Sequence, residues 1–191
     1  VLEVTSEGIK QKRHWGIKFD AAVFTNLERE HIESHGSFEK YYREKQRLFE
    51  RAKNIHILNA DSPYVDLFSK FPAKKKIFYG LRDKKTNSHY TAAALKWESF
   101  LLGDFNRYNI LAAVETVKSY GVSDEVIQRA LDKIKSIPGR MEFIDRGQDF
   151  KIVVDYAHTP GSLEAVYKTL ANSKKQIANS KMICVLGAAG G

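Results

Sequence analysis

Residues 21–58 read AAVFTNLEREHIESHGSFEKYYREKQRLFERAKNIHIL, and they predict the repeating unit of the fold. Its first and last parts, 21–26 and 55–58, are short apolar and β-branched runs, which predict strands. Between them we expect an amphipathic helix that has Ser37 as its N-cap. Its apolar stripe has spacings of three, four and seven and comprises Phe38, Tyr41, Tyr42, Leu48, Phe49 and Ala52. A strand, a helix and a strand in this order are typical of a parallel sheet with crossover helices.

The same alternation continues along the rest of the chain. Short apolar runs predict further strands at 1–6, 77–79, 90–97, 152–155 and 182–186. Helical periods predict helices at 105–120, 124–134 and 162–171, and Ser123 is a good N-cap for the second of them. Pro138 and Gly139 break the pattern, so we place a domain boundary near Pro138. The sequence therefore predicts an α/β fold in two parts.

Both ends of this expected fold look cut. Val1 opens within an expected strand, and Gly191 ends inside a glycine-rich turn that should lead into a helix. We therefore expect the chain to be part of a longer protein.

The composition indicates a folded, basic protein. The chain has 191 residues with 43% hydrophobic content, enough for a substantial core, and a net charge of +8 that favours anionic partners. Its lysines cluster only in short runs without interleaved aromatic residues, so we interpret them as solvated loop charge. A basic nucleic-acid-binding domain remains the alternative that the charge alone allows.

The sequence also bears on cellular location. No apolar run approaches the about 20 residues that cross a bilayer, and the start of the chain lacks the zones of a signal peptide. We therefore expect a cytoplasmic protein without a membrane partner. Cys184 lies in the apolar run 182–186, and we expect it to be a buried small hydrophobe without chemistry of its own.

Polar residues at the carboxyl ends of the expected strands are candidate ligand contacts, because open parallel sheets bind ligands there. Glu3 and Thr5 close the first expected strand, Asn26 closes the second and leads to His31, and Asp155 closes a strand in the second part. Each residue alone has an ordinary structural explanation, since Asn and Asp commonly end strands and a lone histidine is usually structural. Their joint placement makes them candidates.

Lys45 lies on the apolar stripe of the helix that follows Ser37. An inward lysine would have a lowered pKa, because burial disfavours its charged form, and the neutral amine could take up carbon dioxide. The carbamate formed in this way would be a metal ligand similar to a carboxylate. The alternative is a lysine whose stem packs on the stripe while its ammonium group reaches water.

Five groups of residues follow one another along the chain. They are Leu2-Glu3-Val4-Thr5-Ser6 with Val23-Phe24-Thr25-Asn26-Leu27, Glu30-His31, His35-Gly36-Ser37, Tyr41 and Lys45; Gly103 to Asn109 with Leu111-Ala112-Ala113; Pro138-Gly139-Arg140-Met141-Glu142; Val154 to Pro160; and Val185 to Gly191. In this order the five groups resemble the Mur ligases, and the likeness is closest to the MurE type.

This resemblance implies a fold and an activity. Residues 1–138 would be the C-terminal portion of the parallel-sheet central ATPase domain, and residues 139–191 the beginning of the Rossmann-like C-terminal domain. The family forms amide bonds with ATP through an acyl phosphate, and the MurE type adds an amino acid to UDP-N-acetylmuramoyl-dipeptide in peptidoglycan biosynthesis. The protein would be a cytoplasmic monomer that takes part in cell-wall formation, cell shape and division. Its partners would be the UDP-muramoyl peptide, ATP and the amino acid, and not nucleic acid or a membrane.

The resemblance also implies roles for individual residues. The magnesium contacts would be Glu3, His31 and Lys45, with Lys45 as a carbamate, and these three would form the catalytic group. The UDP-muramoyl-peptide contacts would be Thr5, Gln11, Arg13 and Asn26. The nucleotide contacts would be Asn106 and Asn109 on the adenine side, Arg140 from the hinge, and Asp155 on the ribose.

The sequence departs from the family pattern in places. Glu7 stands where a histidine is common and Glu30 where an aspartate is usual, and Glu7 does not keep the chemistry of a histidine. The chain contains no Gly-x-x-x-x-Gly-Lys-Ser/Thr loop, which the family carries upstream of the residue that matches Val1. The segment that selects the amino acid should lie beyond Gly191. Alternatives are another superfamily ligase, of the folylpolyglutamate or cyanophycin synthetase type, and a non-catalytic nucleotide-binding relative.

Overall fold

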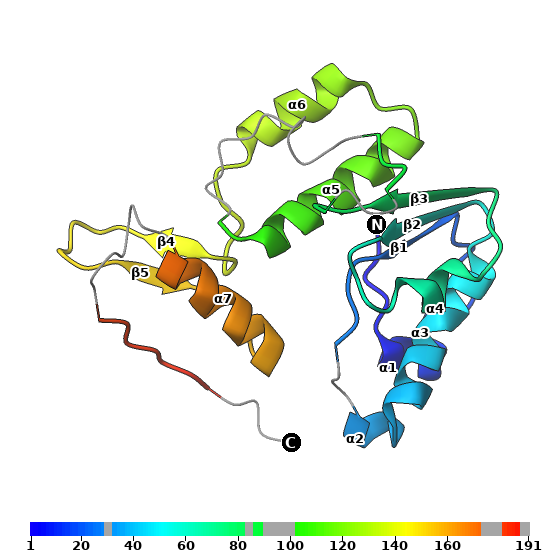
Figure 1. The fold of residues 1–191 in the computed structure, drawn as a ribbon, viewed down its shortest axis with the longest axis horizontal. Coiled ribbons are helices and arrows are strands. Elements are labelled where there is room, and N and C mark those ends of the chain that lie inside the picture. The colour runs from blue at the N-terminus through cyan, green and yellow to red at the C-terminus, as the bar shows by residue number, and fades with distance from the viewer. Residues whose placement is uncertain (29–31, 83–85, 90–101, 173–180, 188–191) are drawn as a thin grey trace. The chain divides into compact units, whose positions relative to one another are not determined.

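The computed structural model describes residues 1–28, 32–82, 86–89, 102–172 and 181–187. The chain divides into two compact units (Figure 1). The first unit comprises Val1–Trp97 and Arg107–Leu131, and the second comprises Glu98–Asn106 and Asp132–Gly191. Each unit has its own core and is described by itself.

The first unit is built on a parallel sheet of three strands in the order β1-β2-β3. The strands are β1 (Ala21–Phe24), β2 (Ile55–Asn59) and β3 (Lys75–Tyr79). In the register of the sheet, Val23 pairs with Ile57, and Ile57 pairs with Ile77. The strands predicted at 21–26, 55–58 and 77–79 and the parallel sheet are therefore confirmed.

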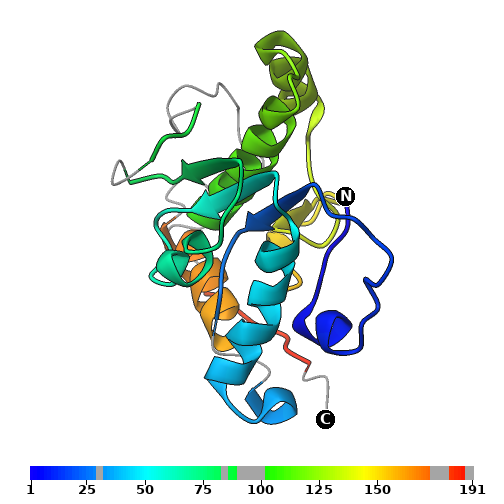
Figure 2. The ribbon, with the colours of Figure 1, turned by 90° about the vertical axis from the view of Figure 1, so that its right-hand side faces the viewer.

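Helix α3 (Phe38–Arg51) connects β1 to β2, as the apolar stripe predicted. The side chain of Ser37 caps it by accepting a hydrogen bond from the Lys40 amide, at 3.1 Å. Together with α4 (Val65–Ser69), α3 packs on one face of the sheet, and α5 (Asp104–Ser119) lies on the other face (Figure 2). The core between the sheet and the helices α3 and α4 contains Ala22, Phe24, Leu27, Tyr41, Phe49, Ala52, Leu58 and Phe68.

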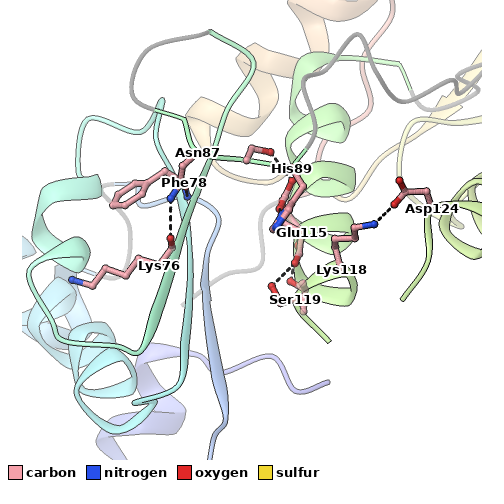
Figure 3. A network of polar contacts seen from close by, with 11 residues as sticks. Lys76, Phe78, Asn87, His89, Glu115, Lys118, Ser119 and Asp124 are labelled. Carbon is pink, nitrogen blue, oxygen red and sulfur yellow. Dashed lines mark hydrogen bonds and ion pairs between the residues drawn. The ribbon is translucent and has the colours of Figure 1, made fainter. Parts of the chain in front are cut away.

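Two further predicted helices are confirmed, namely α5 and α6 (Asp124–Lys133), and most of each belongs to the first unit. Residues 86–89 contact both β3 and α5 (Figure 3). Asn87 continues the hydrogen bonding of the β3 edge, since its amide donates to Phe78 O at 3.1 Å and its Oδ1 accepts from Phe78 N at 2.6 Å. The carboxylate of Glu115 on α5 is fully buried and lies 2.7 Å from His89 Nδ1. This segment is therefore held on both sides.

The second unit contains β4 (Glu142–Ile144), β5 (Ile152–Val154) and α7 (Pro160–Asn172). The strand predicted at 152–155 and the helix predicted at 162–171 are present, whereas β4 was not predicted. The two strands pair in an antiparallel manner, so the parallel arrangement that we expected does not extend to this pair. The turn between them contains Gly147 at a φ of 85°, a conformation that favours glycine.

Two predicted strands are absent where the structure describes the chain. Residues 1–5 are not a strand, because Thr5 caps a short helix, α1 (Ser6–Lys10), that has Glu7 in its first turn. Residues 182–186 are extended but form no strand, and Val185 is 94% exposed. Cys184 is exposed as well, so its predicted burial is wrong. The strand predicted at 90–97 lies outside the described residues.

Within the described ranges, no helix is both long and apolar enough to span a bilayer.

We predict that His56 makes the first unit sensitive to acid. His56 is fully buried in β2, where its Nε2 lies 2.7 Å from Ala52 O, and burial lowers the pKa of its imidazole. The unfolded chain, with a pKa of about 6.5, therefore binds more protons than the folded chain, and the free energy of unfolding should fall as the pH drops below that value.

Urea denaturation of this chain at pH 7.5 and 5.5 measures the effect. The loss of stability between the two pH values should be smaller in His56→Gln than in wild type, because the glutamine does not titrate. An equal loss in both proteins would contradict the prediction.

Candidate functional site

The carboxyl ends of the three parallel strands are joined by side chains. Asn59, at the end of β2, donates from Nδ2 to Thr25 O beyond β1 at 2.8 Å. Its Oδ1 accepts from the amide of Asp61 at 3.1 Å. Asp61 Oδ2 in turn accepts from the amides of Leu81 and Arg82 beyond β3, at 2.7 and 3.1 Å. This edge, where parallel sheets bind ligands, is thus held in one arrangement.

The predicted substrate contact Asn26 lies at the same edge and is exposed. Its Oδ1 accepts from the Leu27 amide at 2.8 Å, and its Nδ2 donates to Glu28 Oε1 at 3.1 Å. Leu27 is buried in the core and anchors the loop. His31, the predicted metal ligand that follows, lies outside the described residues.

The other predicted substrate contacts surround α1. Thr5 Oγ1 accepts from the Gly8 amide at 3.0 Å, so Thr5 has a structural role as the N-cap of this helix. Gln11 is the C-cap, and the amide of Arg13 donates to Gly8 O at 2.9 Å. Gln11 and Arg13 are exposed, as is Glu3, which precedes the helix. The side chains of Gln11 and Arg13 are therefore open to solvent at one end of α1.

Helix α1 is attached to α2 (Ile32–His35) through residues that were not among the predicted site residues. His35 is buried, with its Nε2 3.1 Å from Ser6 Oγ. Glu7 Oε1 lies 3.3 Å from the same nitrogen, an ion-pair distance without hydrogen-bond geometry. Lys10 Nζ donates to Ser34 O at 3.0 Å. Glu7, which departs from the family pattern, therefore faces an imidazole.

Lys45 is half-buried on α3, on the stripe where the period placed it. Its Nζ lies 5.0 Å from the ring centroid of Tyr41, a residue that is 1% exposed. The ring of Tyr41 in turn lies 5.5 Å from that of His35. Lys45 is thus connected through Tyr41 to the residues that hold α1. An aromatic face stabilises an ammonium ion, which opposes the effect of burial.

No three His, Cys, Asp or Glu side chains among the described residues are grouped so as to hold a metal ion. The predicted set contains Glu3, which is exposed, Lys45, which is half-buried, and His31, which is not described. A carboxylate and a lysine carbamate would supply the oxygen ligands that magnesium prefers, and one imidazole is compatible with them. The chemistry of the predicted donors therefore fits this ion.

The two predicted adenine contacts occupy the start of α5. Asn106 is buried, and its Nδ2 donates to Leu102 O at 2.8 Å, whereas Asn109, one turn later, is exposed. Gly103, at a φ of 95°, turns the chain into the helix, and a Cβ there would lie 2.5 Å from the Phe105 ring. Of the two asparagines, Asn109 is the one whose side chain is open to solvent.

In the second unit, the pairing of β4 with β5 brings the predicted Arg140 and Asp155 together. Asp155 accepts from the Met141 amide at 2.8 Å and from the Ala157 amide at 2.7 Å. The Arg140 guanidinium lies 4.7 Å from the ring centroid of Tyr156, which is 64% exposed. Tyr156 was not among the predicted site residues, although it directly follows one.

Comparison with known families identifies two domains. The family described as Mur ligase middle domain matches residues 1–117. The family described as Mur ligase, glutamate ligase domain matches residues 139–191.

Individual relatives extend over the whole chain. The UDP-N-acetylmuramoyl-L-alanyl-D-glutamate--2,6-diaminopimelate ligase of Geobacillus kaustophilus is 36% identical over 212 residues, covering 99% of this chain and 42% of that protein. The enzyme of the same name from Thermosynechococcus vestitus is 35% identical over 210 residues, covering 100% of this chain and 41% of that protein. The chain therefore spans about two fifths of the length of these relatives.

Solved structures agree with this likeness. A structure of UDP-N-acetylmuramoyl-L-alanyl-D-glutamate--2,6-diaminopimelate ligase superposes with a TM-score of 0.70 at 33% identity, covering 93% of this chain and 40% of that one. UDP-N-acetylmuramate-alanine ligase MurC of Thermotoga maritima superposes with a TM-score of 0.62 at 18% identity, covering 91% of this chain and 41% of that one, which is a likeness of fold alone.

Proposed function

Because the chain belongs to the Mur ligase family, we propose that it is part of an ATP-dependent ligase that adds an amino acid to UDP-N-acetylmuramoyl-dipeptide in peptidoglycan biosynthesis. The observation that carries the proposal is the likeness to 2,6-diaminopimelate ligases, at 36% identity over 99% of the chain. The name of these relatives makes 2,6-diaminopimelate the first candidate for the incoming amino acid. Residues 1–138 would belong to the central ATPase domain and residues 139–191 to the C-terminal domain.

We assign the catalytic magnesium contacts to Glu3, His31 and Lys45. The support is the family pattern, the chemistry of the donors and the half-buried position of Lys45. Lys45 would act as a carbamate, since a bare ammonium would repel the ion. When bound, magnesium supplies electrostatic stabilisation of the charge that develops on the transferred phosphoryl group.

The UDP-muramoyl peptide is assigned to Thr5, Gln11, Arg13 and Asn26. The exposed guanidinium of Arg13 suits an anionic group, and the Thr5 hydroxyl has a further lone pair beyond the one that accepts from Gly8. We assign the ATP contacts to Asn106 and Asn109 on the adenine side, and to Arg140 and Asp155. Asn106 would act mainly by shaping the start of α5, because its side chain is buried.

The reaction proceeds in two steps. An oxygen of the substrate's terminal carboxylate attacks the γ-phosphorus of ATP, which releases ADP and forms an acyl phosphate. The neutral amine of the amino acid then attacks the acyl carbon and loses a proton, and the tetrahedral intermediate expels inorganic phosphate to leave the amide. Negative charge develops in both steps, so cationic residues such as Arg140 are suited to the site.

The remaining assignments follow from the same family. The ligase would be a cytoplasmic monomer whose partners are small molecules, without a nucleic-acid or membrane partner. We do not favour a folylpolyglutamate or cyanophycin synthetase, a non-catalytic relative or a nucleic-acid-binding domain, because the relatives that match 99% or more of the chain at 35–36% identity are diaminopimelate ligases.

The experiment that tests the proposal measures ADP release by the longer ligase that contains this chain. Multiple-turnover release should require magnesium, UDP-N-acetylmuramoyl-dipeptide and an amino acid together, and a panel containing diaminopimelate, lysine and glutamate identifies the amino acid. ADP release that is independent of the dipeptide substrate would contradict the proposed function.

A further inference from the structure

One carboxylate oxygen at the carboxyl edge of the sheet accepts three hydrogen bonds. Asp61 Oδ2 lies 2.7 Å from Leu81 N, 3.1 Å from Arg82 N and 2.8 Å from the hydroxyl oxygen of Tyr108. The two amides follow β3, and Tyr108 lies in the first turns of α5. The Asp61 side chain therefore connects the loop after β2, the loop after β3 and α5.

The surroundings of Asp61 restrict its movement. Its own amide is bound by Asn59 Oδ1 at 3.1 Å, and a Cβ on Gly80 would lie only 2.8 Å from its Oδ2. Gly80 is buried and follows the fully buried Tyr79, so the backbone has little room to withdraw. The carboxylate is thus a fixed point on this edge.

Helix α5 has a similar attachment at its other end. The hydroxyl of Tyr120, directly after α5, donates to Asp20 Oδ2 at 2.7 Å, and Asp20 directly precedes β1. This hydrogen bond and a second one from Asn54 lower the pKa of the Asp20 carboxyl. One pair of a tyrosine and an aspartate therefore joins α5 to the carboxyl ends of the strands. A second such pair joins the end of α5 to the amino end of β1. Only the Tyr108 end lies beside a candidate ligand contact, because Asn109 is the next residue.

We infer that Asp61 is a positioning residue for nucleotide recognition, and that it acts through Tyr108 to hold Asn109 at the carboxyl edge of the sheet. This inference rests on the proposed function, in which Asn109 contacts adenine. Neither Asp61 nor Tyr108 needs to touch the nucleotide. They restrict the conformations of the helical turn that carries Asn109. The conformational entropy lost when ATP binds is therefore smaller.

The matched variants Tyr108→Phe and Tyr120→Phe test the inference in the longer ligase. Each variant removes one tyrosine hydroxyl, in α5 or directly after it, together with its hydrogen bond to an aspartate. Both variants should therefore lower the melting temperature by similar amounts. Tyr108→Phe should raise the KM for ATP about threefold to tenfold, the range that the loss of one hydrogen bond allows, and leave kcat and the KM for the UDP-muramoyl dipeptide within about twofold. Tyr120→Phe should leave all three constants unchanged.

The results separate this inference from the proposed function. An unchanged KM for ATP in Tyr108→Phe, or an equal rise in Tyr120→Phe, would overturn the inference while the wild-type enzyme still ligates. A rise in both KM values of Tyr108→Phe would indicate general loosening and would also overturn it. If the wild-type enzyme does not ligate with ATP, the proposed function fails and the nucleotide role of Asp61 fails with it.

Discussion

Replacement of Lys45 with alanine in the longer ligase should reduce kcat by about 1,000-fold, because the proposed carbamate would supply a negatively charged metal ligand where phosphoryl charge develops. Lys45 is half-buried on α3 with its Nζ over the Tyr41 ring, so the truncation leaves the core residues of the helix in place. The reaction rate is measured by ADP release at saturating substrates. Melting curves establish that the variant is folded.

Two further variants separate the carbamate from the positive charge. Lys45→Arg should be as inactive as Lys45→Ala, because a guanidinium keeps the charge and cannot take up carbon dioxide. Lys40→Ala changes an exposed lysine of the same helix and should retain normal activity. A short carboxylic acid added to Lys45→Ala should restore part of the rate by occupying the ligand position. Near-normal activity of Lys45→Arg would show that the carbamate role is wrong.

Asp155→Asn should lower kcat/KM for ATP by about 100-fold, with most of the loss in the KM for ATP. Its carboxylate accepts from the amides of Met141 and Ala157, and an asparagine has one acceptor oxygen in place of two. The amide that loses its partner would release the turn at Met141, which has a φ of 47°. Bonds to a charged group contribute about 1.5–3 kcal/mol each, which gives the expected size when the proposed ribose contact is lost as well.

Asp149→Asn is the matched control for this prediction. Asp149 is exposed in the turn between β4 and β5, so it carries the same change of charge in the same unit without the amide contacts. Its kcat/KM for ATP should equal that of wild type. If both variants lowered kcat/KM for ATP by the same small factor, the loss would come from the changed net charge of the second unit. Asp155 would then have no specific role in nucleotide binding.

The sequence predicted elements best where one local signal was strong. The stripe on α3, the cap at Ser37 and the short apolar runs of β1, β2 and β3 all led to elements that the structure contains. The strand predicted at the start of the chain is absent because Thr5 and Glu7 are also good signals for the start of a helix. The hydrogen bond by which Thr5 caps α1 prevailed over the β-branched run. The strand β4 was not predicted, since its three residues depend on their pairing with β5 for stability.

In the candidate site, too, local patterns predicted the position of some residues, whereas contacts between distant parts of the chain were not predicted. The positions of Lys45 on the stripe and of Asp155 beside β5 follow from local pattern, and the structure places both as expected. Asp61 was not selected, because Asn59, Ala60 and Asp61 read as an ordinary turn. Its contact with Tyr108 joins residues that are 47 positions apart, and no periodicity predicts such a pair. His35 was likewise selected only as part of a motif, although it holds Ser6 on the neighbouring helix.

A ligase that activates a carboxylate as an acyl phosphate transfers one carboxylate oxygen to the phosphate that it releases, so oxygen transfer distinguishes the proposed reaction from others. UDP-N-acetylmuramoyl-dipeptide labelled with 18O in its terminal carboxylate is incubated with the longer ligase, magnesium, ATP and the amino acid. Phosphorus NMR of the released phosphate then reports whether it carries 18O. We predict one labelled oxygen in each phosphate formed, in equal amount to the amide product, and no phosphate when the dipeptide is left out. Unlabelled phosphate released together with the amide, or phosphate released without the dipeptide, would contradict the account.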